Sequence, residues 1–199
     1  MRQWLPKPNL IIALLVSGIL VMFTSCTPQA DGIATDMTNN QNNNCTMREE
    51  LNLDEIQTFN APPVDIQALM EQDQNLPKDA PLRFADSVEV DINPDKNGTW
   101  TSFDEDTQTW RLRIVSPGAL SVSIGFTTFS MPAGACLYLY SSNRETILGP
   151  YTDRDNNEHA QLWTPTLDGE EVIIEISISR ASASQLRLAI GFINRGYKQ

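Results

Sequence analysis

From about residue 86 to residue 194 the chain alternates between apolar and polar residues. A period of two is the pattern of strands that bury one face, because successive side chains of a β-strand point to opposite sides. Val88, Val90 and Ile92 show it first, with polar or acidic neighbours between them. The same alternation recurs over residues 110–114, 122–126, 137–140, 172–178 and 186–192. The pattern therefore favours an all-β fold for this part of the chain.

Turn-forming residues separate these segments. Pro, Gly, Asn and Asp gather at residues 94–98, 116–118, 131–134, 148–150 and 167–169. Short alternating strands at such spacing, with no helical period between them, are typical of two packed antiparallel sheets. We predict an antiparallel β-sandwich, jelly-roll-like, with about eight or nine strands between residues 86 and 194. The domain that contains it is expected to span residues 61–199.

A short helix is expected before the first of these strands. Apolar residues follow Pro62-Pro63 at roughly helical spacing, namely Val64, Ile66, Leu69 and Met70. Asp65 near the start suits the helix dipole, and Pro77 and Pro81 lead the chain out of the helix. We expect the apolar side of this helix to pack against the sandwich.

The first 25 residues have the composition of a bacterial signal peptide. Arg2 and Lys7 supply positive charge, and a mostly apolar run extends from Leu10 to Phe23. That run is shorter than the roughly 20 apolar residues that a transmembrane helix needs. Thr24-Ser25-Cys26 then resembles the bacterial lipobox, whose cysteine is lipidated and becomes the new N-terminus. We predict a signal peptide over residues 1–25 and lipidation of Cys26; ordinary signal cleavage and an uncleaved anchor are the alternatives, and each exports the protein.

Residues 26–60 are expected to form an Asn-rich disordered tether. Residues 39–44 are all Asn or Gln, and the segment around them has few large apolar side chains. Such a stretch cannot offset its ordering entropy by burial. If Cys26 carries lipid, the tether would hold the domain away from a bacterial membrane, on its periplasmic or cell-surface face. Without the lipid, the protein would be secreted.

Two further cysteines, Cys45 and Cys136, form an even pair in an exported chain. In an oxidising compartment they could form a disulfide that joins the tether to the domain. Because spacing alone does not establish a bridge, we favour the alternative. In that alternative Cys136 is a small buried residue on a strand and Cys45 is free in the disordered segment.

Charge and histidine content exclude several classes of function. The chain has 25 acidic and 14 basic side chains, a formal net charge of −11. Binding to nucleic acid or adsorption to anionic lipid requires the opposite balance, so neither is expected. His159 is the only histidine, which leaves little material for a multi-histidine metal centre or for His-dependent acid–base catalysis. We therefore expect no catalytic residues, metal or cofactor, and membrane contact only through a lipid anchor.

One acidic segment has part of the spacing of a calcium-binding loop. Asp153, Asp155 and Asn157 supply oxygen ligands at alternate positions. Glu158, however, stands where such a loop needs Gly for its sharp turn, and Thr164 stands at the twelfth position in place of Glu. We interpret the segment as a solvated acidic turn.

Aromatic residues offer a second candidate site. Trp100, Trp110 and Trp163 could form a sugar-binding platform on one face of the sandwich. Aromatic side chains in sandwiches more often fill the core, and we favour the core for these three. His159, in a polar stretch, is interpreted as a loop residue.

Several short phrases occur in an order that resembles a known family. They are Gly98–Trp100, Trp110–Ala119, Met131–Tyr140, Leu148–Thr152, Trp163–Pro165 and Ile193–Tyr197. Together they resemble the N-terminal pre/pro region that precedes the catalytic domain in bacterial secreted trypsin-like serine proteases of the lysyl endopeptidase type. The resemblance covers roughly residues 64–197. It implies a non-catalytic module, because the chain contains neither a Gly-Asp-Ser-Gly nucleophile phrase nor a histidine in the family's catalytic setting.

Three functions remain open. The first is a non-catalytic exported module that binds a protease or another extracellular protein, either assisting its folding or masking its active site. The second is a truncated or split trypsin-like serine endopeptidase whose catalytic domain is lost or encoded separately. The third is a carbohydrate- or matrix-binding surface domain that uses exposed aromatic residues.

Overall fold

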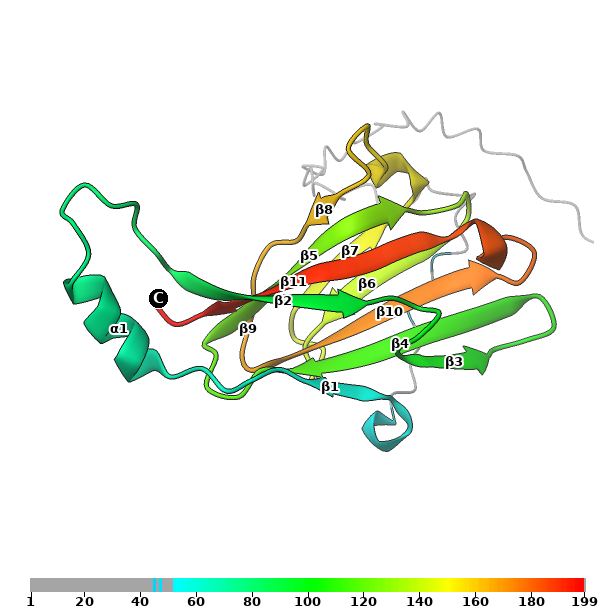
Figure 1. Cartoon of the computed structure of the whole chain (residues 1–199). Coiled ribbons are helices and arrows are strands. Elements are labelled where there is room, and N and C mark those ends of the chain that lie inside the picture. Colours follow the sequence, from blue (N-terminus) through cyan, green and yellow to red (C-terminus); the bar gives the residue numbers. More distant parts are fainter. Residues whose placement is uncertain (1–44, 46, 48–51, 199) are drawn as a thin grey trace, which may run out of the picture. The chain divides into compact units, whose positions relative to one another are not determined.

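The alternating segments form the strands of two facing sheets in the computed structural model, which describes Cys45, Met47 and residues 52–198 (Figure 1). All of these residues belong to a unit that spans Asn40–Gln199. The predicted signal peptide, Cys26 and most of the predicted tether lie outside the described residues. No helix within the described part is long and apolar enough to cross a membrane.

Sheet 1 has six strands, in the order β1-β4-β10-β6-β7 with β3 beside β4. Its strands are β1 (Thr58–Asn60), β3 (Thr99–Ser102), β4 (Thr107–Val115), β6 (Cys136–Tyr140), β7 (Ile147–Tyr151) and β10 (Glu171–Ser179). β1 is parallel to β4, and the other described pairings in the sheet are antiparallel.

Sheet 2 has five strands, in the order β2-β11-β5-β8 with β9 also beside β5. They are β2 (Ala85–Ile92), β5 (Ser121–Ser130), β8 (Leu162–Trp163), β9 (Leu167–Asp168) and β11 (Arg187–Gly196). All its described pairings are antiparallel. Three short 3₁₀ helices complete the connections, namely η1 (Leu53–Glu55), η2 (Asp153–Asp155) and η3 (Ala183–Gln185).

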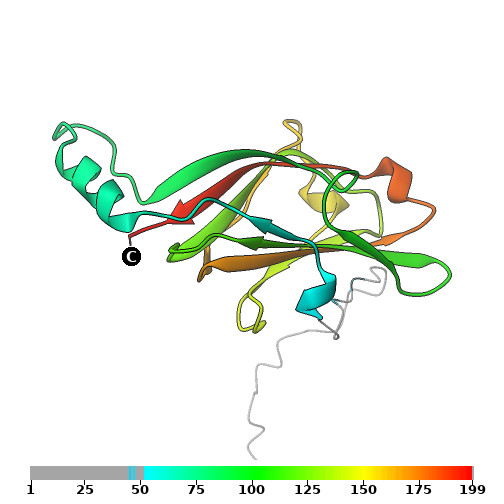
Figure 2. The same ribbon diagram turned by 60° about the horizontal axis from the view of Figure 1, so that its bottom comes forward.

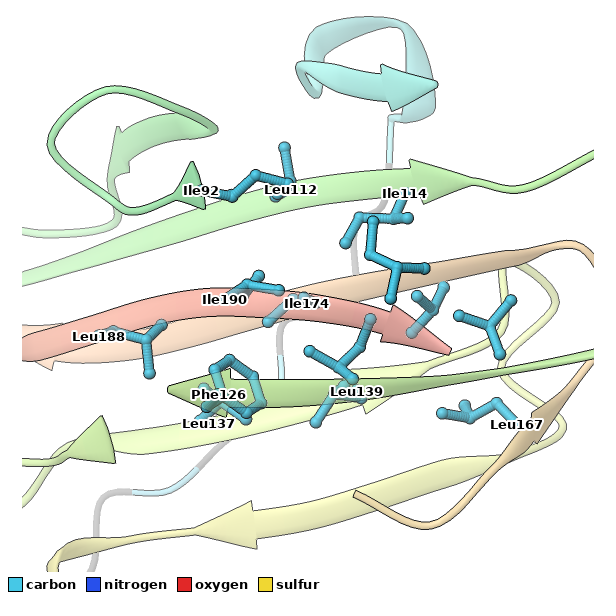
Figure 3. Packing of buried hydrophobic residues seen from close by; sticks show 14 of the residues in the cluster. Ile92, Leu112, Ile114, Phe126, Leu137, Leu139, Leu167, Ile174, Leu188 and Ile190 are labelled. Atoms are coloured by element: carbon cyan, nitrogen blue, oxygen red, sulfur yellow. The ribbon is translucent and has the colours of Figure 1, made fainter. Parts of the chain in front are cut away.

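The core lies between the two sheets. On β4, Trp110, Leu112 and Ile114 are at most 1% exposed, whereas Arg111 and Arg113 point to the other face. Figure 3 shows the inward residues of both sheets gathered together, among them Ile174, Phe126 and Ile190. The period of two therefore predicted the sandwich correctly, because each strand buries one set of alternate side chains.

Two strands depart from that pattern, β10 and its neighbour β6, all five residues of which are buried. β10 is buried on both faces, since Ile173 and Glu175 on its outer side are as inaccessible as the inward residues. The cause is the segment that begins at Cys45, which covers the outer face of sheet 1. It forms a second hydrophobic cluster there, made of Cys45, Met47, Leu53 and Ile56 from the segment and Ile173, Cys136, Tyr138 and Tyr140 from the sheet.

The predicted helix is α1 (Ile66–Gln74), which begins after Asp65. The Asp65 side chain caps it by accepting a hydrogen bond of 3.0 Å from the backbone N–H of Ala68. Ile66 and Leu69 pack against the core, as expected, but Met70 remains 42% exposed. In Figures 1 and 2, α1 and the loop after it extend beyond one end of the sandwich, beside the C-terminus.

Two sequence-based expectations, the number of strands and the start of the folded part, need correction. Ten strands, β2–β11, lie where about eight or nine were expected, because the two-residue strands β8 and β9 are too short to show an alternating pattern. The folded part also starts before residue 61: Ile56 is buried and Thr58–Asn60 pair with Arg113–Val115. Backbone pairing with β4 and the packing of Ile56 and Phe59 against the two hydrophobic clusters order this segment.

Candidate binding site

Cys45 and Cys136 are joined by a disulfide, with their Cα atoms 5.6 Å apart. The preference for a free Cys45 is therefore wrong, although Cys136 is a fully buried strand residue, as that interpretation also held. The bond fixes the start of the described chain to β6, and the Tyr138 hydroxyl donates to the Cys45 carbonyl at 3.1 Å. Since disulfides persist in oxidising compartments, the bond indicates an exported protein.

Beneath this covering segment lies a buried charge cluster. The Glu175 carboxylate accepts hydrogen bonds from Arg111 Nε at 2.9 Å and from the Tyr140 hydroxyl at 2.7 Å. Burial, reinforced by the nearby Glu175 carboxylate, raises the pKa of Tyr140, so this hydroxyl stays protonated and remains a donor. The cluster is enclosed by protein, and its arrangement satisfies buried charge instead of presenting a reactive group to solvent.

A second ionic cluster ties α1 to the end of the chain. Asp73 receives the ammonium of Lys198 at 2.5 Å, the hydroxyl of Tyr197 at 2.7 Å and Arg83 Nε at 3.0 Å. The hydrogen bonds from Lys198 and Tyr197 lower the pKa of Asp73 to about 2. This carboxylate therefore stays ionised at all but strongly acidic pH and holds the helix against the C-terminal strand.

In the acidic segment around Asp153, two of the candidate ligands are engaged in local turns. The side chain of Asp155 accepts from the backbone N–H of Thr152 at 2.6 Å, and that of Asn157 accepts from the backbone N–H of His159 at 3.1 Å. Both oxygens thus stabilise their own turn. His159 is exposed, 3.4 Å from the Glu158 carboxylate. Within residues 52–198, Cys45 and Met47, no group of three or more metal-ligating side chains is assembled.

The three tryptophans do not form one platform. Trp110 is fully buried, as expected, and donates its indole N–H to the Asn97 carbonyl at 2.7 Å. Trp100 lies opposite it on β3, is 37% exposed and donates to the Pro94 carbonyl. Trp163 belongs to the other sheet and is 54% exposed. The expectation of a core position is therefore confirmed for Trp110 and wrong for Trp163 and Trp100.

Trp163 belongs to a surface that sequence reasoning missed. Its ring centroid lies 5.5 Å from that of Phe192, with the two planes inclined by 28°. Next to this pair a cavity of about 590 Å³ opens on the outer side of sheet 2. The available signal was Gly125, an isolated glycine in the middle of an alternating strand, because such a glycine often marks close approach of another group.

These features define a disulfide-bonded β-sandwich domain of the exported type, with an open polar and aromatic surface on one sheet. Residues 95–193 match the family model of the lysyl endopeptidase N-terminal domain. Over β3–β10 and most of β11 the chain is therefore similar to that domain, which confirms the resemblance found in its motifs. The matched region begins after α1 and β2.

Proposed function

We propose that this chain is a non-catalytic exported module that binds a protein partner, and that the partner is a secreted protease of the lysyl endopeptidase type. The family match carries this proposal, because a domain that precedes a protease in its relatives is suited to contact the protease fold. Through that contact the module would either assist the folding of the protease or mask its active site.

A surface suited to such a partner lies at the end of the domain beside the C-terminus. Four apolar side chains are exposed on α1 and the loop that follows it, namely Met70, Leu76, Leu82 and Phe84, with Leu82 at 82% and Phe84 at 57%. We call these residues the apolar end. Clustered exposed apolar residues are typical of protein-binding surfaces. The Asp73 cluster holds this part of the chain against Tyr197 and so fixes its orientation.

The test is a titration of the chain, carrying Cys26→Ser to prevent lipidation, against the catalytic domain of a secreted lysyl endopeptidase. We expect a one-to-one complex by calorimetry, and Leu82→Asp should weaken it by tenfold or more, because it places a charge in the apolar contact. Phe103→Asp, on the exposed β3–β4 turn, is the matched control and should bind normally. Absence of a complex, or a complex indifferent to Leu82→Asp, would contradict the proposal.

We further propose that the module has no peptidase activity of its own. Nucleophilic catalysis requires a base next to the nucleophile, and His159 lies exposed beside Glu158. The full chain should leave lysine and arginine ester substrates uncleaved. Turnover that His159→Ala abolishes without changing the melting transition would refute this. The alternative of a split endopeptidase predicts a following reading frame that encodes a His/Asp/Ser domain.

Anchoring is proposed through Cys26. The apolar run that ends at Thr24-Ser25-Cys26 supports lipidation, and the disulfide supports an extracytoplasmic location. Cells fed labelled palmitate should incorporate the label into the wild-type chain and not into Cys26→Ala. Release of the wild-type protein without detergent would count against the anchor.

For the sandwich itself we propose jelly-roll connectivity. The chain passes repeatedly from one sheet to the other, and β11 lies between β2 and β5 while β10 lies between β4 and β6. These neighbours are the ones expected when two Greek keys are folded over each other. An experimental structure with a different strand order would overturn this assignment.

A further inference from the structure

The outer face of sheet 2 presents outward side chains from four strands in register. Phe192 on β11 lies opposite Gly125 on β5 and Glu89 on β2. Two residues further along β11, Asn194 lies opposite Ser123 on β5 and Ser87 on β2. Because directly opposed residues of an antiparallel pair share a face, these side chains form successive rows across the sheet. The next row contains Ser121 and, beside it on β9, Asp168.

The aromatic row is held in a fixed position. Trp163 lies over Gly125, where a Cβ atom would collide with the indole ring. The neighbouring residue, Thr164, fixes the short strand β8: its backbone N–H donates to the Ile124 carbonyl and its hydroxyl accepts from the Ile124 N–H, each at 3.0 Å. A glycine in a strand interior costs stability, so it is expected here for the close approach that it permits. The result is a fixed pair of rings, in which Trp163 is exposed and Phe192 is half-buried.

The polar row is also organised in advance. The Ser87 hydroxyl donates to Asn194 Oδ1 at 2.6 Å, and Asn194 Nδ2 donates to the Ser123 hydroxyl at 3.3 Å. The side-chain amide is thereby held between two hydroxyls, with donor and acceptor capacity left over for a ligand. Fixed polar groups beside a fixed aromatic surface are the arrangement that a binding site needs.

A hollow in this face gives room for a ligand. The cavity of about 590 Å³ is lined by Ser121, Ser123 and Asn194 from the floor and by Thr166, Asp168 and Phe84 from its sides, among other residues. Its volume falls within the range of small-molecule sites, about 300–1,000 Å³. The strand rise of about 3.3 Å per residue places Ser121 roughly 13 Å from Gly125. The cavity and the aromatic row thus form one extended site along β5 and β11.

We propose that this face binds a neutral oligosaccharide, with one sugar ring stacked on Trp163 and Phe192 and another hydrogen-bonded to Asn194, Ser123 and Asp168. Sugar rings present apolar C–H faces and a rim of hydroxyl groups, which match exposed aromatic rings and short polar side chains respectively. Phe84 belongs to the apolar end and also lines the cavity, so the two proposed sites adjoin there. Leu82 belongs to the apolar end alone and Trp163 to the aromatic row alone, and variants at these two residues therefore separate protease binding from saccharide binding.

Charge selects among saccharides. Asp168 lines the cavity, and exposed Glu89 flanks Phe192. Lys198, a cation that also lines the cavity, is paired with Asp73. The whole chain is acidic, with a formal net charge of −11. Anionic glycans would therefore be repelled, whereas carboxylates accept hydrogen bonds from neutral hydroxyl groups.

The test uses native gels that contain soluble polysaccharides, run with the full chain carrying Cys26→Ser. Barley β-glucan, xyloglucan, galactomannan and soluble starch are the neutral probes, and polygalacturonate is the anionic one. At least one neutral polysaccharide should retard the chain, and polygalacturonate should not. Trp163→Ala should weaken the retardation about tenfold or more, as expected for loss of an aromatic contact. Trp163→Phe should restore part of it.

Two further variants make the result specific. Asn194→Ala should weaken binding by about three- to tenfold, the effect of losing one or two hydrogen bonds. Trp100→Ala, which removes the partly exposed tryptophan of sheet 1, is the matched control and should bind as the parent does. Each variant is checked for an unchanged thermal transition. The proposal would be overturned if no neutral polysaccharide retarded the chain, or if Trp163→Ala were retarded as strongly as the parent. It would also be overturned if no saccharide bound and Trp163→Ala lost protease binding. That last result would make the face a protein-docking surface.

Discussion

Opening the Cys45–Cys136 disulfide should remove a large part of the stability of the folded unit. The two cysteines are 91 residues apart in sequence. Closing a loop of that length in the unfolded chain costs about 4.6 kcal/mol of conformational entropy at 25 °C in the chain-entropy treatment of cross-links. For a domain of this size that corresponds to a fall in Tm of roughly 10–18 °C. Release of the segment from residue 45 would also expose Tyr138 and Ile173, which adds to the loss.

Urea unfolding followed by tryptophan fluorescence measures this effect. The chain with Cys26→Ser is compared in oxidised and reduced form, because reduction removes the cross-link with little change in side-chain volume. A variant that also carries Cys45→Ala and Cys136→Ala should match the reduced form and should not respond to reductant. The m value should rise in both, since an unfolded chain without the cross-link exposes more surface.

A loss of free energy of unfolding below about 1 kcal/mol would refute the reasoning, because it would mean that the cross-link hardly restricts the unfolded chain. An alanine variant whose midpoint follows the oxidised form would have the same consequence. If reduction disrupted only the second hydrophobic cluster, on the outer face of sheet 1, the reduced form would show two unfolding transitions. The one at lower urea concentration would be detected by the fluorescence of nearby aromatic residues.

Three other perturbations have defined outcomes. Arg111→Met should lower the free energy of unfolding by about 3 kcal/mol, because it removes the guanidinium that pairs with the buried Glu175 carboxylate. A double-mutant cycle with Glu175→Gln, measured by urea unfolding, should show coupling between the two residues. Asp73 has a lowered pKa in the folded state, about 2 against 3.8, so its contribution to stability is complete above pH 4 and is lost as the pH falls toward 2. Asp73→Asn should flatten the acid limb of a pH–stability curve in that interval. Gly98→Ala should destabilise by about 1–3 kcal/mol, because Gly98 has φ +82° and an added Cβ would meet the Trp110 ring; a midpoint within error of the parent would contradict this.

The sequence predicted the sandwich because inward positions are set by local alternation. Trp110, Leu112 and Ile114 could be assigned to the core before any partner strand was known, since they alternate with the charged Arg111 and Arg113. β8 could not be predicted in the same way. Leu162 and Trp163 form a strand only because Thr164 is hydrogen-bonded to Ile124 in a distant part of the chain.

The candidate binding site shows the same limit more clearly. Alternation indicates that Ser123 and Gly125 face away from the core, but it does not say which residues lie beside them. Asn194 and Ser87 are 107 residues apart and become neighbours only through the register of β2 and β11. The disulfide was likewise not derivable, because a separation of 91 residues says nothing about the 5.6 Å between the two Cα atoms.

The disulfide also determines how the folded unit would respond to a mechanical force. A pull on the chain upstream of Cys45 is transmitted through the sulfur–sulfur bond to Cys136 at the start of β6. The intervening residues, which include β1, α1 and β2–β5, lie inside the covalent loop and bear no tension. Under load between its two ends, the oxidised unit can lengthen only from Cys136 onward, whereas the reduced unit can be peeled from β1.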